Sequence, residues 1–353
     1  MNVKINEDNV SEKLHEANSI EGFYANTGIL VTGATDFAME VSASLRKNDI
    51  DEVIECLPHF LASTTSAVKI LNIHFNRQSF SKLFQLIAKQ WKQLELNGEL
   101  HVLEETVMHG NKMAQFYNTT LVTFMVLFLL VPLISPILDI IRPLNETRTR
   151  QQLLKVNYIF FNDDNYFFYV YLQLFWASGV VVLTIIAADW LYMLIIHHNS
   201  GLFAVYEVQK TTTISDYFTD EIILENYMYQ KFRNCVIMHN ETIRFYKLLN
   251  DCSQGSYLIQ VGLNMLIISA TAVQTMVNLD KPAEAIRSAV FCGASQFHLF
   301  LLSLPGQVLL DNCSALAENT CEDYCSLSAG GLYEMNIENF GIVSTSLTVL
   351  HIQ

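Results

Sequence analysis

The sequence predicts an all-α, polytopic membrane protein, a seven-helix bundle with an intracellular N-terminus and a cytosolic helical anchor. Four stretches of at least twenty-three residues contain no Asp, Glu, Lys or Arg, namely 113–138, 165–188, 252–279 and 288–310. A helix needs roughly 20 apolar residues to cross the hydrocarbon core, where only helices and closed barrels satisfy their backbone polar groups. A buried helix of a soluble protein could explain one such stretch. It does not explain four.

Seven candidate spans follow when weaker apolar segments are added to these four stretches. Lys69 interrupts one of the weaker segments, and it lies near enough to a helix end for its ammonium group to reach the membrane surface. Asp189 also lies near the end of a predicted span, where an interfacial position explains it. The predicted spans are 22–45, 57–76, 115–140, 166–190, 253–279, 285–308 and 335–353.

Composition and short motifs exclude several classes of protein. The 353 residues are 51% hydrophobic and 16% charged, which is typical of a membrane protein with sizeable aqueous loops. A net charge of −14 argues against nucleic-acid binding, which requires clustered Lys and Arg. The seven cysteines form no CxxC pair and have no His at ligand spacing, so no metal site is predicted. We find no motif of an enzyme or of a cofactor-binding fold.

The distribution of basic residues predicts the orientation in the bilayer. Lys and Arg are more frequent in the segments that would be inside if the N-terminus is cytosolic, so the chain is predicted to be N-in and C-out. Seven spans in this orientation are inverted relative to G-protein-coupled receptors, and the short motifs of that class are also missing.

Residues 209–250 form a long segment that is helical in pattern and cytosolic in this topology. Apolar side chains recur there at steps of three and four, which predicts a helix with one apolar face. Such a helix either extends the following span into the cytosol or meets another subunit. His239 on this face is interpreted as a polar group at a packing interface.

Three motifs in the C-terminal half resemble the insect odorant receptor family. The first is the run FRNCVIMHNETIRFYKLLN at 232–250, which precedes an apolar span. The second is FHLFLLSLPGQ at 297–307, followed by Ser314. The third and most specific is LSAGGLYEMNIENF at 327–340. Upstream of these motifs, only the number and spacing of the spans agree with the family.

The resemblance implies a subunit of an odorant-gated, non-selective cation channel. Members assemble with a shared co-receptor into a hetero-oligomer, expected to be a tetramer, in the plasma membrane of olfactory neuron dendrites. Residues 1–305 would form the ligand-binding bundle, and 306–353 would supply an anchor and a pore-lining last helix. The residues implied in subunit contacts are His239, Gly306, Gln307 and Ser314, and those implied in the gate are Val349 and Leu350.

The implied ligand is a small, volatile, apolar odorant bound in the outer half of the bundle. Such a pocket needs apolar and aromatic walls with a few polar groups that orient the ligand. In the N-in topology, the residues that meet this description are Ser66, Phe128, Phe168, Tyr171, Leu172, Phe175, Trp176 and Phe291.

The sequence also departs from the family pattern, and alternatives stay open. The segment between Ser314 and Leu327 is short and acidic, and the last helix is about three residues short. A truncated, non-conducting copy is therefore one alternative, and a gustatory receptor of the same superfamily is another. A carrier is the alternative from a different class, although the two halves of the chain show no inverted symmetry.

Overall fold

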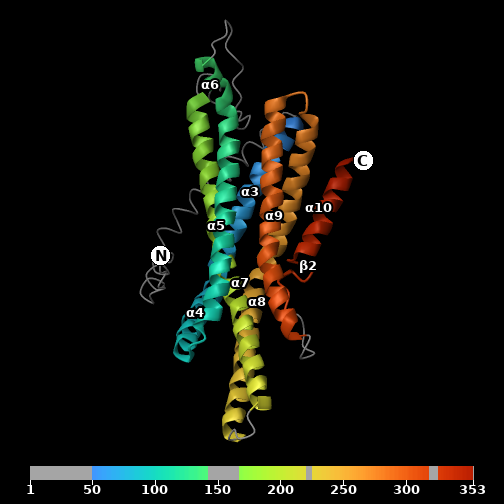
Figure 1. The fold of residues 1–353 in the computed structure, drawn as a ribbon. Helices are drawn as coiled ribbons and strands as arrows, with labels where there is room; N and C mark the ends of the chain where they lie inside the picture. The colour runs from blue at the N-terminus through green and yellow to red at the C-terminus, as the bar shows by residue number, and fades with distance from the viewer. Residues whose placement is uncertain (1–49, 142–166, 220–224, 318–324, 353) are drawn as a thin grey trace.

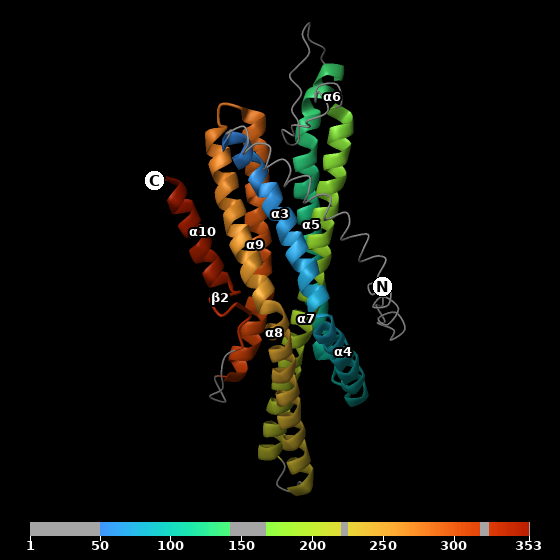
Figure 2. The same cartoon turned by 180° about the vertical axis from the view of Figure 1, so that it is seen from behind.

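The computed structural model describes residues 50–141, 167–219, 225–317 and 325–352, and it is an elongated bundle of helices (Figures 1 and 2). The one addition to the predicted all-α class in these ranges is a small antiparallel hairpin. The elements are α3 (Ile50–Phe75), α4 (Arg77–Asn97), α5 (Leu100–Leu130), the 3-10 helix η1 (Val131–Leu133), α6 (Ile134–Ile141), α7 (Phe167–Thr219), α8 (Glu225–Val277), α9 (Pro282–Ala317), β1 (Ser328–Ala329), β2 (Tyr333–Glu334) and α10 (Ile337–Ile352).

Four helices in the described part of the chain are long and apolar enough to cross a membrane. They correspond to α5, α7, α8 and α9, and each overlaps most of one charge-free stretch of the sequence. The predicted span 115–140 is broken near its end, because Pro132 lacks a backbone N–H and the chain passes through η1 before α6. The predicted spans 57–76 and 335–353 correspond to α3 and α10. The predicted span 22–45 lies outside the described residues.

Helices α7 and α8 are much longer than a bilayer requires. Each contains 53 residues, so each is roughly 80 Å long, against about 30 Å for the hydrocarbon core. Their lower halves continue beyond the other helices as a paired extension (Figure 1). Cys235, Phe245 and Leu249 of α8 are buried in a cluster that also contains side chains of α4, α7 and α9. Residues 225–250 of the predicted segment belong to α8, which runs without a break into the following span, whereas residues 209–219 form the end of α7.

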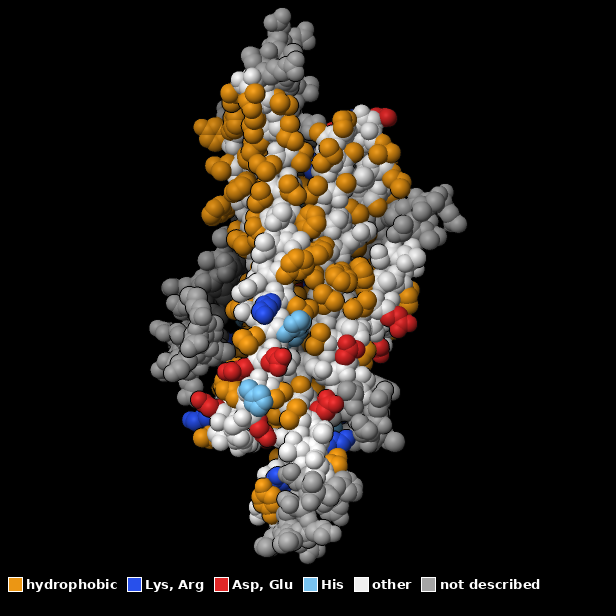
Figure 3. Space-filling view, viewed as in Figure 1, with side chains coloured by type: hydrophobic (Ala, Val, Ile, Leu, Met, Phe, Trp, Pro, Cys, Tyr) orange, Lys and Arg blue, Asp and Glu red, His pale blue; other side chains and the backbone are white. Residues whose placement is uncertain are grey.

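The surface divides into an apolar part and a charged part. On the face shown in Figure 3, hydrophobic side chains cover most of the upper bundle, whereas Asp, Glu, Lys and His gather over the lower part. Large exposed apolar side chains of the upper part include Leu127, Leu183 and Leu266. This distribution is the one expected when the upper bundle is surrounded by lipid and the lower part by water.

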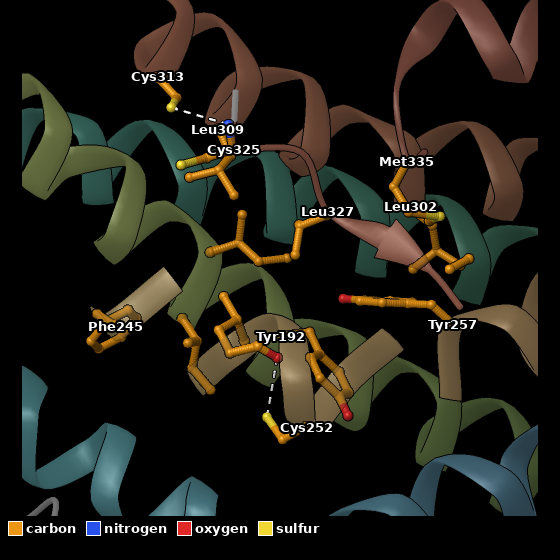
Figure 4. Close-up of a cluster of buried hydrophobic side chains, with 14 of the residues drawn as sticks. Tyr192, Phe245, Cys252, Tyr257, Leu302, Leu309, Cys313, Cys325, Leu327 and Met335 are labelled. Carbon is orange, nitrogen blue, oxygen red and sulfur yellow. Dashed lines mark hydrogen bonds between the residues drawn. The ribbon is translucent and has the colours of Figure 1, made fainter. Parts of the chain in front are cut away.

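The hairpin fastens the C-terminal part of the chain to the bundle. Leu327, Ala329 and Met335 are buried, and Figure 4 shows Leu327 and Met335 in a cluster with side chains of α7, α8 and α9. The hairpin turn docks on α8, because the Gly330 N–H donates to the carbonyl of Gln254 at 3.0 Å. Gly330 has a φ of +61°, and a Cβ there would lie 2.6 Å from a methyl of Leu258. Both the turn and the close contact therefore require glycine.

Helix α9 holds the beginning of α10 through two neighbouring residues. A Cβ on Gly306 would lie 1.9 Å from the Met335 carbonyl oxygen, so the backbones of α9 and the hairpin touch at this point. The Oε1 atom of Gln307 accepts a hydrogen bond of 3.2 Å from the Ile337 N–H, the first of α10. The Asn336 side chain caps the same helix by accepting from the Asn339 N–H at 2.8 Å. Past this junction α10 leans away from α8 and α9 (Figures 1 and 2).

The substitution Gly306→Ala should weaken this junction. Overpacking of a close contact costs about 1–3 kcal/mol, here because the methyl group would press on a backbone oxygen that cannot rotate away. The expected result is a lower unfolding temperature of the detergent-purified protein and faster proteolysis of the segment after α9. Gly262→Ala in α8 is the matched control, since nothing lies within 4 Å of its Cβ. Equal unfolding temperatures for the two variants would contradict the assignment.

Candidate ligand-binding site

An apolar cavity of about 130 Å³ lies among five helices in the upper bundle. It is similar in size to cavities of roughly 150 Å³ that hold a benzene-sized molecule. The lining side chains come from α3, α5, α7, α8 and α9, so the cavity exists only when these helices are packed together. They are His59, Ala62, Ser63, Thr65, Leu121, Phe124, Met125, Phe128, Ala177, Ser178, Val181, Val182, Ile185, Asn264, Ile267, Val290, Phe291, Ala294, Ser295 and His298.

One end of the cavity is aromatic. The ring of His59 lies 5.4 Å from that of Phe128 and 5.0 Å from that of Phe291, centroid to centroid. The Phe128 and Phe291 rings are themselves 5.8 Å apart. Tilted rings at such distances attract each other beyond their apolar burial. These three side chains, from α3, α5 and α9, therefore form a fixed wall for an apolar or aromatic group.

A cluster of buried polar side chains, which we call the polar cluster, joins the same five helices. Its members are Lys69 of α3, Tyr117 of α5, Asp189 of α7, Gln260 of α8 and His298 of α9. The Asp189 carboxylate forms an ion pair with Lys69, accepts a hydrogen bond from the Tyr117 hydroxyl, and lies 3.1 Å from His298 Nε2. The Lys69 ammonium also donates to Gln260 Oε1 at 2.6 Å. Each buried charge is thus both paired and hydrogen-bonded, as burial requires.

The polar cluster forms the floor of the cavity. His298 belongs to both. Each of the other four members lies four residues from a lining residue of the same helix, and residues at this spacing share a helix face. The pairs are Lys69 with Thr65, Tyr117 with Leu121, Asp189 with Ile185, and Gln260 with Asn264.

Two expectations about charged residues were wrong. Lys69 does not extend to the membrane surface, and Asp189 does not lie at an interface, because both side chains are 0% exposed. Asp189 lies well inside α7, which runs from Phe167 to Thr219 without a break. The physical reason is their mutual pairing, which removes the need of either charge for water.

The structure places the eight residues predicted for ligand binding in three different surroundings. Phe128 and Phe291 line the cavity. Ser66 is buried outside the lining, and Tyr171 packs beside the cavity with its hydroxyl donating to the Leu129 carbonyl at 2.8 Å. The structure does not bring the remaining four to the cavity, because they lie on exposed faces of α7, where Trp176 is 67% exposed; they are Phe168, Leu172, Phe175 and Trp176.

The residues predicted for subunit contacts and for the gate lie below and beside the cavity. His239 lies on the paired extension with its ring 4.9 Å from that of Tyr206. Gly306 and Gln307 hold the start of α10, as described above. The Ser314 hydroxyl donates to the Asp311 carbonyl within α9. Val349 and Leu350 belong to the last turns of α10. The predicted domain boundary at 305/306 falls inside α9, which continues through it.

Sequence reasoning missed the histidines, the small polar residues and the polar cluster. One signal could have found the cluster: Lys69 and Asp189 are single charges of opposite sign in otherwise apolar helices, and such residues usually pair. Asn264 and Gln260, four residues apart in an apolar span, are a second signal. Ser63, Ser178 and Ser295 carry no such signal, because small polar residues are common in helices of membrane proteins.

The fold and the apolar cavity define a multi-pass helical membrane protein with room for a small apolar ligand. The chain belongs to the odorant receptor family, because the family described as 7tm Odorant receptor matches residues 49–320. This match favours the odorant receptor over the gustatory receptor and the carrier.

Solved structures agree with this fold. The insect olfactory receptor OR5 from Machilis hrabei in complex with eugenol is similar with a TM-score of 0.69 at 10% identity, covering 93% of this chain and 87% of that one. A second structure of the same receptor has a TM-score of 0.66 at 11% identity, covering 93% and 86% of the two chains. No curated protein sequence matches this chain at a significant level.

The ion pair of the polar cluster should be critical for stability. Lys69→Met leaves the Asp189 carboxylate buried without its counter-charge, which should lower the free energy of unfolding by roughly 3–5 kcal/mol. The double variant Lys69→Met/Asp189→Asn should recover part of this loss, because neither charge remains and the amide still accepts hydrogen bonds. Thermal unfolding in detergent measures both effects.

The exposed ion pair between Lys89 and Glu241 provides the control. These side chains are 61% and 39% exposed and 3.4 Å apart, so Lys89→Met should change stability by no more than about 1 kcal/mol. A Lys69→Met variant as stable as Lys89→Met would show that the buried pair is not required. A double variant less stable than Lys69→Met would show that charge pairing is not the cause.

Proposed function

We propose that the cavity binds a small, volatile odorant and that ligand binding there opens a cation-conducting pore. The observation that carries the proposal is the apolar cavity itself, formed jointly by five helices of a chain in the odorant receptor family. A ligand that fills such a space changes the packing of all five helices together. The insect receptor with the similar fold has been solved with eugenol, a small aromatic molecule, which supports a ligand of this size class.

Helix α10 is the pore-lining element in this proposal. It packs against α9 through the ring pair Phe300 and Phe340, 5.2 Å apart. Its other side carries exposed apolar residues, including Ile342, which is 58% exposed. An apolar helix face of this kind suits a position between subunits, around a central pore. Val349 and Leu350 near its end are the proposed hydrophobic gate.

The proposed assembly is a hetero-oligomer, with four subunits, of this chain and the shared co-receptor in the plasma membrane of olfactory neuron dendrites. In it the N-terminus is cytosolic, and the paired extension of α7 and α8 lies in the cytosol. Gly306 and Gln307 support the subunit contacts indirectly, because they fix the start of α10 on α9.

Co-expression in a heterologous cell tests this function. The chain is expressed alone and with a co-receptor, its amount at the surface is measured through an epitope tag, and whole-cell current is recorded across an odorant panel. We expect inward cation current to a subset of odorants only when both chains are present. Normal surface expression without current to any odorant would contradict the proposal and would favour the truncated, non-conducting copy.

Phe291 and Trp176 were both predicted for ligand binding from the sequence, but their substitutions should now have different effects on the response to an odorant. Phe291→Ala removes a ring from the cavity wall, so the concentration for half-maximal response to a known agonist should rise at least about tenfold, as expected when 1.5–3 kcal/mol of apolar contact is lost. Trp176→Ala should leave this concentration unchanged within about threefold, because Trp176 faces away from the cavity. Dose–response curves at matched surface expression measure both. A larger effect at Trp176 would place the ligand on the other face of α7.

A further inference from the structure

His298 is the one cavity residue whose hydrogen-bonding role is set by the polar cluster. Its Nε2 atom lies 3.1 Å from the Asp189 carboxylate. A carboxylate only accepts hydrogen bonds, so Nε2 must carry the hydrogen. The remaining ring nitrogen, Nδ1, has no hydrogen-bond partner in the part of the chain that the structure describes.

Charge balance decides what Nδ1 can do. The carboxylate of Asp189 is already matched by the ammonium of Lys69, and both are fully buried. Beside a pair whose charges already balance, the tautomer with its hydrogen on Nε2 completes the cluster without a further charge and leaves a lone pair on Nδ1. The lone pair on Nδ1 is then a hydrogen-bond acceptor.

Other polar groups of the lining do not impose a choice of ligand chemistry. The Thr65 hydroxyl donates to the Leu61 carbonyl at 2.9 Å. One N–H of the Asn264 amide donates to the Ser295 carbonyl at 3.0 Å, and its second N–H and its oxygen can donate to or accept from either class of ligand. A serine hydroxyl can donate or accept, so Ser63 and Ser178 suit alcohols and carbonyl compounds equally. An imidazole nitrogen that only accepts requires a donor.

From this geometry we infer that the preferred odorants carry a hydroxyl group, as in alcohols and phenols, and that the hydroxyl donates to Nδ1 of His298. The inference rests on the proposed function and names the ligand class for the same cavity. The apolar body of the ligand packs on the aromatic end. Phe291 and His298 lie seven residues apart on α9, roughly 10 Å along the helix axis. A ligand with its hydroxyl at one end and an apolar group at the other fits this distance.

Matched pairs of odorants test the inference directly. The probes are eugenol with methyl eugenol, benzyl alcohol with benzyl methyl ether, and 1-hexanol with 1-methoxyhexane, which differ only in the capped hydroxyl. Applied to cells that express the full receptor with a co-receptor, the hydroxyl member of each active pair should act at a concentration about tenfold lower than its ether. Loss of one hydrogen bond to a buried acceptor produces a difference of this order.

Two histidine variants separate the chemistry of His298 from the shape of the cavity. His298→Phe keeps an aromatic ring but has no acceptor, so the alcohol and its ether should act within about threefold of each other. His101→Phe is the matched control and should retain the preference, because His101 is an exposed residue of α5 that does not line the cavity. Epitope staining compares the amounts of each variant at the surface.

The outcomes distinguish this inference from the proposed function. If the unmodified receptor responds equally to alcohols and ethers, or if His298→Phe at the surface keeps the preference, the hydroxyl inference is overturned while the odorant-gated function stands. If the unmodified receptor reaches the surface and responds to no odorant of a broad panel, the proposed function is overturned, and the inference with it.

Discussion

The buried ion pair between Lys69 and Asp189 is the interaction on which the arrangement of the upper bundle depends. Two full charges inside an apolar bundle are tolerated only when the pair is close and the remaining hydrogen-bonding positions are filled. Here Tyr117, Gln260 and His298 fill them. Because the five partners come from five different helices, the requirement fixes all five relative to one another. Apolar packing alone would specify this arrangement less sharply, since lipid and side chains offer similar surroundings to an apolar residue.

Helix α9 connects the cavity to the last helix, the two features on which the proposed channel function rests. It contributes Phe291 to the aromatic end of the cavity and His298 to its floor. Further along, Gly306 and Gln307 of the same helix hold the start of α10. Pro305 lies inside α9 directly before Gly306 and lacks a backbone N–H, so the helix can bend between the cavity and the base of α10. The cavity and the last helix are therefore linked by one element of the fold.

The sequence predicted the class of fold well and the site only in part. Long charge-free stretches directly predict helices in lipid, and those in this sequence correspond to α5, α7, α8 and α9. The side of α7 that faces the cavity was not readable, because aromatic residues such as Trp176 can face lipid as readily as a ligand. Phe128 and Phe291 were placed at the cavity, whereas His298 was noticed only within a family motif. Its role follows from contact with Asp189, which lies 109 residues away in the chain, and no local pattern encodes such a distance.

The buried lysine of helix α3 affects the order in which the helices can enter the membrane. Helix α3 is synthesised before the other described helices, yet it is not among those that are long and apolar enough to cross a membrane. Its lysine has no counter-charge until α7, 120 residues later in the chain, has been made. A newly synthesised α3 therefore has little reason to stay in lipid alone. We expect α3 to enter the bilayer late, together with α7. Its position in the membrane would then depend on helices that are synthesised after it.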